Sequence, residues 1–413
     1  MIVGMDAPSP VTILSFEEAR AVVEKHAAAL APKGKELVPL LDAAGQVLAE
    51  PLIADRDFPP FHRAARDGYA VIASDTQNRP ATLELVAEIR AGAVPEREIV
   101  IGHGQAAAIM TGAPAPSGAD SIVMVEYTSR HGDEVEITRP VSAGENIIPR
   151  GSEAKRGQQL LPAGRRLDYA AIAVAASIGR PYALVYTKPK IAVLATGDEL
   201  VDIDVLPKPV QIRNSNTYSL AAQIHEAGGE PVILPIAPDE PDRLRELIEE
   251  GIEADLLLIA GGVSAGKYDL VEAVLQELKA EFFFTGAKIQ PGKPIVFGKV
   301  REKYFFGLPG NPISTMVTFE LFVRPMVAAL CGLQPRKLFF LSARLKTEIH
   351  TKTGLKRFLP GTLSGEFEHC EVDLAPWGGS GDVAGAARAN CYLVILPDRE
   401  HIPAGEWVPV LMR

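Results

Sequence analysis

The sequence DLLLIAGGVSAGKYD, residues 255–269, joins a short apolar run to a glycine-rich turn and the start of a helix. The run from Leu256 to Ala260 is too short for a helix and is typical of a strand buried on both faces. The turn begins at Gly261 and Gly262, and a helical pattern runs from Tyr268 to Leu275. Glycines let the backbone approach a ligand closely, and free N–H groups at a helix start favour anions. This stretch therefore predicts a parallel α/β sheet with a pocket for an anion or a nucleotide-like molecule.

Two other stretches repeat this design. Residues 190–199, KIAVLATGDE, and residues 304–315, YFFGLPGNPIST, both pass from an apolar run into a turn rich in glycine and polar residues. In the second stretch, Asn311 suits the N-cap of the following helix and Pro312 suits its first position. This placement leaves the Ser314 hydroxyl near the helix start. Because the carboxyl ends of parallel strands meet at one edge of a sheet, we expect the three turns to form a single crevice.

The composition is typical of a soluble globular protein, since 47% of the 413 residues are hydrophobic and 23% are charged. This length predicts roughly two to four domains. A formal net charge of −10 argues against broad nucleic-acid binding and against binding to an anionic membrane. The N-terminus lacks the pattern of a signal peptide, and the longest apolar run, Tyr169 to Ala176, is far below the ~20 residues of a membrane span. We therefore expect a cytoplasmic protein.

The cysteines and histidines give no sign of a metal or redox site. The three cysteines and eight histidines show no spacing that is typical of metal ligands or of redox motifs. A chain of this size also does not need disulfides for stability. The sequence therefore predicts neither zinc chemistry nor a disulfide framework.

The order of the patterns divides the chain into regions. A capping box at Ser15 to Glu18 starts a helix, and a second helical pattern follows around Leu40 to Leu48. Short strands follow Pro51, strands and helices alternate from Lys188, and β-like runs return near the C-terminus. We expect an α/β multidomain fold: a central doubly wound, mostly parallel sheet domain, a β-rich inserted lobe and a C-terminal small β-barrel or sandwich. The predicted boundaries are 1–50 for the N-terminal helices, 51–145 for the β-rich lobe, 146–187 for a connecting loop and helix, 188–330 for the α/β domain and 335–413 for the C-terminal β domain.

Acidic residues follow several of the predicted strands. Asp198 and Glu199 follow one strand, and Asp239 and Asp269 come after two others on the same edge of the sheet. Carboxylates at such an edge suit a Mg²⁺ ion that bridges to substrate phosphates. Simpler roles stay open, because Asp239 and Asp269 are also plausible helix caps, and the other two acids are plausible turn formers. Asn216 is the expected N-cap of the helix that follows it.

The glycine-rich turn also resembles a phosphate-binding loop of NTPases. Gly261, Gly266 and Lys267 match most of that pattern. Tyr268, however, stands where the loop needs Ser or Thr to reach Mg²⁺, and no strand elsewhere clearly ends in the second metal-binding Asp. The sequence therefore disfavours an NTPase.

The loop Pro291-Gly292-Lys293-Pro294 is more informative. Prolines on both sides of a lysine fix the loop and aim the ammonium, which favours a preorganised oxyanion contact over a solvated lysine. No proline holds the basic pair Lys356-Arg357 in this way, so that pair is equally consistent with plain surface. The stretch 377–382, WGGSGD, is either a tight turn or a backbone nest for an anion.

Taken together, these residues resemble the molybdopterin molybdenumtransferase family, which includes the E domain of gephyrin. The resemblance covers nearly the whole chain. Any one of its motifs would be weak alone, but the set in this order is specific. The motifs are PPF at 59–61, DGYAV at 67–71, MTGAP at 110–114, TGDEL at 196–200, GGVS at 261–264, PGKP at 291–294 and LPGNP at 308–312.

The resemblance implies that molybdate is inserted into the dithiolene of adenylylated molybdopterin, which gives the molybdenum cofactor and AMP with the assistance of Mg²⁺. It also implies an elongated homodimer whose site combines the α/β domain of one subunit with lobes of the other, and it allows a transient contact with a molybdopterin adenylyltransferase. Two other activities stay open: adenylylation of molybdopterin, and a gephyrin-like assembly scaffold. The extra lobes argue against the first, and the lack of a long extra segment argues against the second.

The family's functional residues can be carried over by motif. The implied catalytic residues are Asp67, Thr111, Glu199, Asp269 and Lys293. The implied metal ligands are Asp239 and Asp269. The implied substrate-binding residues are Glu153, Thr196, Gly197, Asp198, Asn216, Gly261, Gly262, Ser264, Pro294, Gly310, Asn311, Ser314, Arg357 and Ser380.

Molybdate is a tetrahedral dianion, so the resemblance implies that Lys293, Ser314 and Ser380 grip it. The chain departs from the family near this place. Gln290 stands where many members have a basic residue, and Leu355 occupies the usual place of an arginine. Lys288 and Arg357 are the candidates to replace them.

Overall fold

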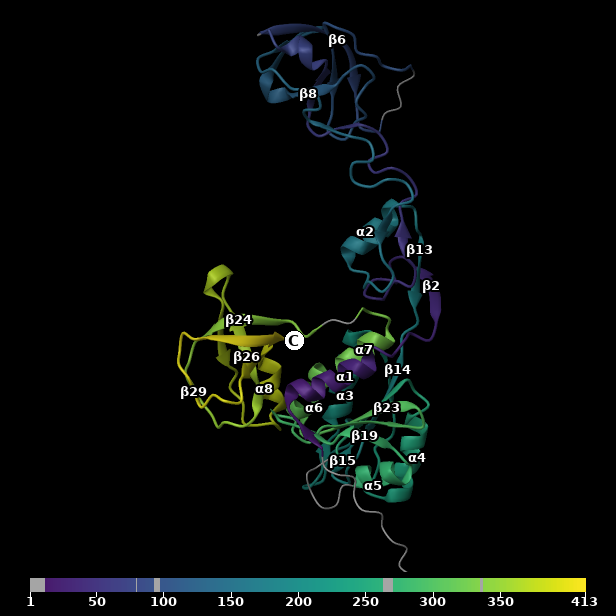
Figure 1. Ribbon diagram of the computed structural model, residues 1–413, viewed down its shortest axis with the longest axis vertical. Helices are drawn as coiled ribbons and strands as arrows, with labels where there is room; N and C mark the ends of the chain where they lie inside the picture. Colours follow the sequence, from purple (N-terminus) through teal and green to yellow (C-terminus); the bar gives the residue numbers. More distant parts are fainter. Residues whose placement is uncertain (1–11, 79, 93–96, 263–269, 335–336) are drawn as a thin grey trace, which may run out of the picture.

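The computed structural model describes residues 12–78, 80–92, 97–262, 270–334 and 337–413. The molecule is elongated, with a β-rich lobe at one end and the α/β domain at the other (Figure 1). A narrow region around α2 (Tyr169–Ser177) connects them. The C-terminal domain, yellow in Figure 1, lies beside the α/β domain.

The α/β domain is built on a six-stranded sheet in the order β17-β14-β18-β23-β22-β19. The first four strands of this order are parallel, and β22 is antiparallel to both of its neighbours. The mostly parallel sheet predicted around residues 256–260 is therefore confirmed. Its strands are β14 (Lys190–Ala195), β17 (Glu230–Ile233), β18 (Leu256–Ala260), β19 (Glu281–Phe284), β22 (Val296–Val300) and β23 (Lys303–Leu308).

Helices cover both faces of this sheet. Val193 and Leu258 face a core shared with α1, α3, α6 and α7, whereas Leu194 and Leu257 face a core shared with α4 and α5. Consecutive residues enter opposite cores because side chains alternate along a strand, and the domain is doubly wound as predicted. The helices are α1 (Phe16–Ala27), α3 (Ser215–Ala227), α4 (Pro241–Gly251), α5 (Leu270–Glu277), α6 (Pro312–Thr318) and α7 (Arg324–Leu330).

α6 and α7 form one helical run through a π-helical turn at Phe319–Val323. Within the described residues, this 19-residue run is long and apolar enough to cross a membrane, with a mean hydropathy of 1.4. However, 72% of its apolar window is buried inside the protein. A helix that is apolar all round and packed in this way is typical of a domain core.

α1 begins with the predicted capping box. The Ser15 Oγ accepts a hydrogen bond from the Glu18 N–H at 3.2 Å, and the Glu18 carboxylate accepts one from the Ser15 N–H at 2.8 Å. Phe16, Ala19 and Val23 are buried on one face of the helix. This face packs α1 into the core of the α/β domain.

The second helix predicted around Leu40 to Leu48 is wrong. Residues 40–45 form a turn, and Val47 and Leu48 form β-bridges to residues far along the chain. Gly45, with φ 80°, ends the turn in the left-handed region. Val47 and Leu48 are therefore buried by strand-like contacts rather than on a helix face, whereas Leu41 is 83% exposed. Of the described N-terminal residues, only those of α1 are helical up to residue 50.

The N-cap of α3 is Asn214, and the prediction of Asn216 as the cap is wrong. The Asn214 Oδ1 accepts a hydrogen bond from the Thr217 N–H at 3.2 Å. Asparagine is a favourable N-cap residue at both positions. Because the helix starts at Ser215, Asn214 is the cap. Asn216 lies inside the first turn of the helix, and its side chain makes other contacts.

Replacing Asn214 with alanine is expected to lower the free energy of unfolding by about 1 kcal/mol, because the Thr217 N–H loses its capping acceptor. Chemical denaturation followed by circular dichroism measures this loss. Ser215→Ala, at the exposed neighbouring position, is the control and should change the free energy by less than about 0.5 kcal/mol. An equal loss in both variants would show that the cap is not the cause.

The other two lobes are rich in β-structure. The sheet of the inserted lobe has the order β8-β5-β7-β6-β10-β9. In the C-terminal domain, β26, β27, β24, β30 and β28 pair in a circle that the β26–β28 pairing closes, so this domain is a closed barrel. The strands are β5 (Gly68–Val71), β6 (Ala81–Ile89), β7 (Gln105–Ile109), β8 (Ser121–Met124), β9 (Thr128–His131), β10 (Glu134–Ile137), β24 (Phe340–Leu345), β26 (Lys356–Ser364), β27 (Glu371–Leu374), β28 (Cys391–Ile395) and β30 (Trp407–Met412).

Candidate functional site

The carboxyl ends of β14, β18 and β23 lie side by side and are tied by backbone hydrogen bonds. The Thr196 N–H donates to the Ala260 carbonyl at 3.1 Å, and the Gly261 N–H donates to the Leu308 carbonyl at 3.1 Å. The next residue after Thr196, Gly197, donates to the Ala237 carbonyl at 3.2 Å. The predicted turns therefore meet at one edge of the sheet.

Glycines are required where these turns approach one another. Gly261 has φ 99°, and a Cβ added there would lie 2.6 Å from the Thr196 carbonyl oxygen. A Cβ at Gly262, which has φ 63°, would lie 2.5 Å from Val271 Cγ2. A Cβ at Gly310 would lie 3.6 Å from the Gly261 Cα. A side chain would clash at Gly261 and Gly262, whereas the contact at Gly310 is of ordinary van der Waals length.

Asp198 and Asp239 lie together on this edge. The Asp198 Oδ1 accepts a hydrogen bond from the Asp239 N–H at 3.0 Å. Asp239 is not the cap of α4, because Glu240 occupies that position and makes no capping bond with its side chain. Asp198, Glu199 and Asp239 are exposed and have no basic partner within the described residues. Exposed carboxylate oxygens without a counter-charge are the ligands that Mg²⁺ prefers.

Asn216 links α3 to the turn after β23. Its Nδ2 donates to the Gly310 carbonyl at 2.7 Å, while its Oδ1 is buried and has no hydrogen-bond partner. A buried acceptor without a partner is costly, so a donor from a ligand or a water molecule suits this position. The Asn216 side chain therefore faces the site rather than capping its own helix.

The start of α6 meets two other loops. The Ile313 N–H donates to the Ser380 carbonyl at 3.0 Å, and Ser314 is 4% exposed. Asn311 is the N-cap of α6, as predicted, but its side chain makes no capping bond. A Cβ at Gly292 would lie 3.6 Å from the Ser314 carbonyl oxygen, so the loop 291–294 lies against α6.

Lys293 belongs to the loop 291–294 beside the start of α6, and its charge has no neutralising partner among the described residues. Its backbone carbonyl accepts from the Ala287 N–H at 3.0 Å, which fixes the loop, and Pro294 follows it. Its side chain is exposed and makes no ion pair with any described residue. This arrangement suits an anion that binds from solution.

Arg357 is buried beside this loop. It lies on β26 opposite Gln290 of β21 (Ile289–Gln290). Arg357 is 6% exposed, and the one hydrogen bond of its side chain within the described residues runs from Nη1 to the Leu355 carbonyl at 3.2 Å. Burial lowers the pKa of the Arg357 guanidinium, and no described acid pairs with it. The interpretation of Arg357 as plain surface is therefore wrong.

Lys356, the other member of the basic pair, has a structural role. Its Nζ pairs with the Glu17 carboxylate and lies 4.9 Å from the centre of the Phe16 ring. These contacts hold the barrel against α1. The basic pair therefore divides into one residue at the domain contact and one buried residue whose side chain has no acidic partner among the described residues.

Asp67 and Thr111 form a second cluster in the β-rich lobe. The Asp67 Oδ1 accepts from the Thr111 N–H at 2.6 Å and from its hydroxyl at 2.8 Å. These hydrogen bonds, with that of the backbone first, lower the pKa of Asp67, so this carboxylate stays charged at neutral pH. Glu153 pairs with Arg63 at 2.8 Å.

The structure thus brings some predicted residues together and leaves others apart. The sheet edge, the loop 291–294, Arg357 and the Ser380 turn form one region. The β-rich lobe with Asp67 and Thr111 stands at the far end of the same chain (Figure 1). Ser264 and Asp269 lie outside the described residues.

Asp382 is a residue of this region to which the sequence pattern assigned no role. Its carboxylate accepts from the Gly378 N–H at 2.8 Å and from the Gly385 N–H at 2.9 Å, which fixes the turn that carries Ser380. These backbone hydrogen bonds lower the pKa of Asp382. Its place at the N-cap of α8 (Val383–Arg388) was the available signal.

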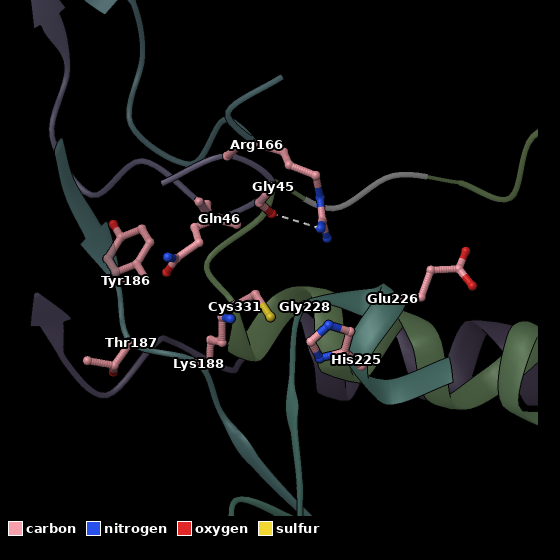
Figure 2. Close-up of a pocket in the computed structure, with 12 residues that line it drawn as sticks. Gly45, Gln46, Arg166, Tyr186, Thr187, Lys188, His225, Glu226, Gly228 and Cys331 are labelled. Carbon is pink, nitrogen blue, oxygen red and sulfur yellow. Dashed lines mark hydrogen bonds between the residues drawn. The ribbon is translucent and has the colours of Figure 1, made fainter. Parts of the chain in front are cut away.

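A cavity of about 220 Å³ lies away from these residues, where the connecting region meets the end of α3 (Figure 2). Arg166 donates to the Gly45 carbonyl at 3.0 Å and to the Ala227 carbonyl at 2.8 Å. Burial raises the pKa of the Cys331 thiol to about 11, so the thiol stays protonated and is a poor nucleophile. We interpret this cavity as a space left where the connecting region packs against the α/β domain.

Three family models together match most of the chain. The MoeA N-terminal region (domain I and II) matches residues 14–179. A probable molybdopterin binding domain matches residues 192–329. The MoeA C-terminal region (domain IV) matches residues 342–412.

Curated relatives and solved structures agree with these models. A molybdopterin molybdenumtransferase of Nostoc sp. is 37% identical over 91% of this chain and 88% of its own length. A molybdopterin molybdenumtransferase of Bacillus subtilis is 32% identical over 91% of this chain and 89% of its own length. A molybdopterin biosynthesis MoeA protein from Pyrococcus horikoshii superimposes with a TM-score of 0.80 at 29% identity, over 97% of this chain and 100% of that one. A second structure of a MoeA protein from this organism superimposes with a TM-score of 0.74 at 33% identity, over 97% of this chain and 99% of that one.

Proposed function

The chain belongs to the MoeA family and is a molybdopterin molybdenumtransferase, an enzyme of molybdenum cofactor biosynthesis; from this premise we propose that it inserts molybdate into adenylylated molybdopterin and releases AMP. The observation that carries the proposal is that the loop 291–294 lies against the start of α6 at Ser314, and that Arg357 pairs with Gln290 beside this loop. We call this region the molybdate corner. Two cationic side chains without acidic partners in the described residues, together with a hydroxyl, suit a tetrahedral dianion such as molybdate.

The same corner suits the chemistry of the insertion step. Oxo ligands leave molybdate as the dithiolene sulfurs bind, and cleavage of the phosphoanhydride develops negative charge on the phosphate oxygens. Lys293 and Arg357 are fixed donors that stabilise this charge. The Ser314 hydroxyl donates to a molybdate oxygen and orients the ion.

The sheet edge holds the pterin phosphates in this proposal. Backbone N–H groups at Gly262 and Gly310 approach the phosphates closely because these residues lack side chains, and Gly197, whose N–H is bonded to the Ala237 carbonyl, lines the same turn. Asn216 offers its unpartnered Oδ1 to an N–H of the substrate. Thr196, Asp198, Gly261, Asn311 and Pro294 line the same place.

Mg²⁺ fits the acids on this edge. Asp239 and Asp198 present exposed carboxylate oxygens within one hydrogen-bonded pair, and we propose them, with Asp269, as the groups near the ion. When bound, Mg²⁺ neutralises charge on the phosphates. Glu199 remains on the same turn as a candidate proton acceptor.

We propose that the protein acts in the cytoplasm as a homodimer, in which a second subunit completes the site. The lobe at 51–145 that carries Asp67 and Thr111 stands far from the sheet edge of its own chain (Figure 1). A partner subunit brings its lobe, with Glu153 at its base, over the α/β domain (188–330) and the C-terminal domain (335–413). A transient contact with the adenylyltransferase would deliver the substrate.

Incubation of the protein with adenylylated molybdopterin, molybdate and Mg²⁺ is expected to release AMP and to form the molybdenum cofactor. Chromatography of the products measures both. AMP at the level of a protein-free control would overturn the proposal. Pyrophosphate release from ATP and molybdopterin would instead support adenylylation, and cofactor-independent clustering of a second protein would support a scaffold.

A further inference from the structure

A pair of short strands on the C-terminal barrel carries an unassigned cluster of metal-ligand side chains. β25 (Ile349–His350) and β29 (His401–Ile402) pair antiparallel, with His350 opposite His401. Ile349 and Ile402 are buried, at 5% and 2% exposed. Because side chains alternate along a strand, the two histidines point outward from the barrel. Glu348, two residues before His350, shares its face.

The three side chains converge on one point. The His401 Nε2 lies 3.0 Å from the Glu348 Oε2, and the His350 Nε2 lies 3.8 Å from the same oxygen. One ligand atom from each residue lies within 4.8 Å of the others. The two imidazole rings stack with their centres 4.4 Å apart and their planes 9° apart. We call these residues the His-His-Glu cluster.

Among the described residues, no charged group besides the two histidines pairs with the Glu348 carboxylate. Arg399, which is close in sequence to His401, is instead bound to the Glu406 carboxylate at 2.7 and 2.8 Å. The cluster therefore keeps two imidazole nitrogens and one carboxylate oxygen available to a cation.

The strands hold the cluster in place. Besides the β25–β29 pairing, the Thr351 N–H donates to the Glu400 carbonyl at 2.8 Å. The paired isoleucines anchor both strands in the barrel core. Binding of one ion at bonds of about 2.0–2.2 Å requires these exposed side chains to rotate out of their stacked arrangement.

We propose that the His-His-Glu cluster binds a divalent ion of borderline softness, Zn²⁺ in the first place. Two imidazoles and one carboxylate match the ligands of Zn²⁺, whereas Mg²⁺ prefers oxygen ligands alone. Three protein ligands leave a fourth position for water or for a group of another molecule. The site lies on β29 at the side of the barrel away from the α/β domain (Figure 1), so it is separate from the proposed molybdate corner and does not depend on it.

The sequence patterns predicted no zinc site, because the two histidines are far apart in the chain. Only the antiparallel register places them opposite each other. The pattern Glu348-Ile349-His350 puts two ligands on one face of a strand, which is the local part of the signal. The partner strand supplies the third ligand.

Calorimetric titration of the metal-free full-length chain with Zn²⁺ tests the proposal. We expect a site of 1:1 stoichiometry in the unchanged protein and an affinity lowered at least about tenfold in His350→Ala/His401→Ala, since ligand removal weakens a borderline-metal site. His369→Ala is the matched control, because His369 is also exposed beside a glutamate, Glu368, at 3.9 Å. The Zn²⁺ affinity of His369→Ala should equal that of the unchanged protein.

Two further measurements identify the ligand atoms. Co²⁺ in place of Zn²⁺ should give visible d–d absorption in the unchanged chain, which Glu348→Gln weakens without loss of side-chain volume. Zn²⁺ affinity should likewise fall in Glu348→Gln, because the amide replaces a carboxylate ligand. Equal affinity in the double variant, or equal Co²⁺ absorption, would overturn the proposal. Thermal unfolding of each variant confirms that a loss of binding is not a loss of fold.

Discussion

Lys293→Ala is expected to lower kcat/KM for molybdate by roughly 10²–10³-fold, because removing one preorganised donor to a developing anion typically costs that much. The lysine sits between two prolines, and its backbone carbonyl is held by the Ala287 N–H at 3.0 Å. Its ammonium makes no ion pair with a described acid, so its full charge is available to substrate. Alanine removes that charge and leaves the loop in place.

The effect should appear in the dependence on molybdate and not in that on the pterin. Initial rates of AMP release, with each substrate varied in turn, separate the two. Lys25→Ala, on the exposed side of α1, is the control and should leave both dependences unchanged. An unaltered molybdate dependence in Lys293→Ala would remove Lys293 from the molybdate corner.

The central sheet could be predicted because its strands are apolar on both faces. Leu256 to Ala260 is buried at every position, which is the pattern that a parallel strand covered on both sides requires. The false helix at 40–48 shows the limit of this reasoning. Val47 and Leu48 of this pattern are buried by β-bridges to Arg166 and Val185, and no local signal marks those partners.

The turns of the candidate site were also visible in the sequence, since glycine and proline fix backbone shape locally. The identity of the residues that face the site was less predictable. Asn214 and Asn216 are the same residue type, so either could be the N-cap, and only the residue at which the helix starts distinguishes them. Asp382 acts through the backbone of a glycine turn, which no spacing pattern specifies.

The residue-by-residue register between distant strands could not be predicted. The pairing of Gln290 with Arg357 depends on the register between β21 and β26, which lie in different domains. The approach of His350 to His401 depends on another register. Sequence patterns give the face on which a side chain lies, but they do not give its neighbour on the next strand.

Arg357→Met is expected to reduce turnover about 100-fold while leaving the fold as stable as before or more stable by about 1 kcal/mol. The guanidinium has five N–H donors, and one hydrogen bond within the described residues uses them. An unpaired buried charge opposes folding, and an apolar side chain of similar length does not. The same charge binds an oxyanion strongly, because hydrogen bonds between charged groups are worth about 1.5–3 kcal/mol each. Stability and activity should therefore change in opposite directions.

Chemical denaturation with and without molybdate distinguishes this role from a packing role. Molybdate at about a hundred times its Kd should stabilise the unchanged protein by about 2.7 kcal/mol, and it should stabilise Arg357→Met much less. Arg344→Met is the control, since Arg344 is exposed on β24 and lies 5.4 Å from the ring centre of Trp407. A loss of more than about 2 kcal/mol in the free energy of unfolding of Arg357→Met would mean that the guanidinium supports the barrel core. If the free energy of unfolding is unchanged, the fall in turnover measures how much the Arg357 charge contributes to catalysis. This charge is unpaired in the free protein and pairs with the anion when the anion binds.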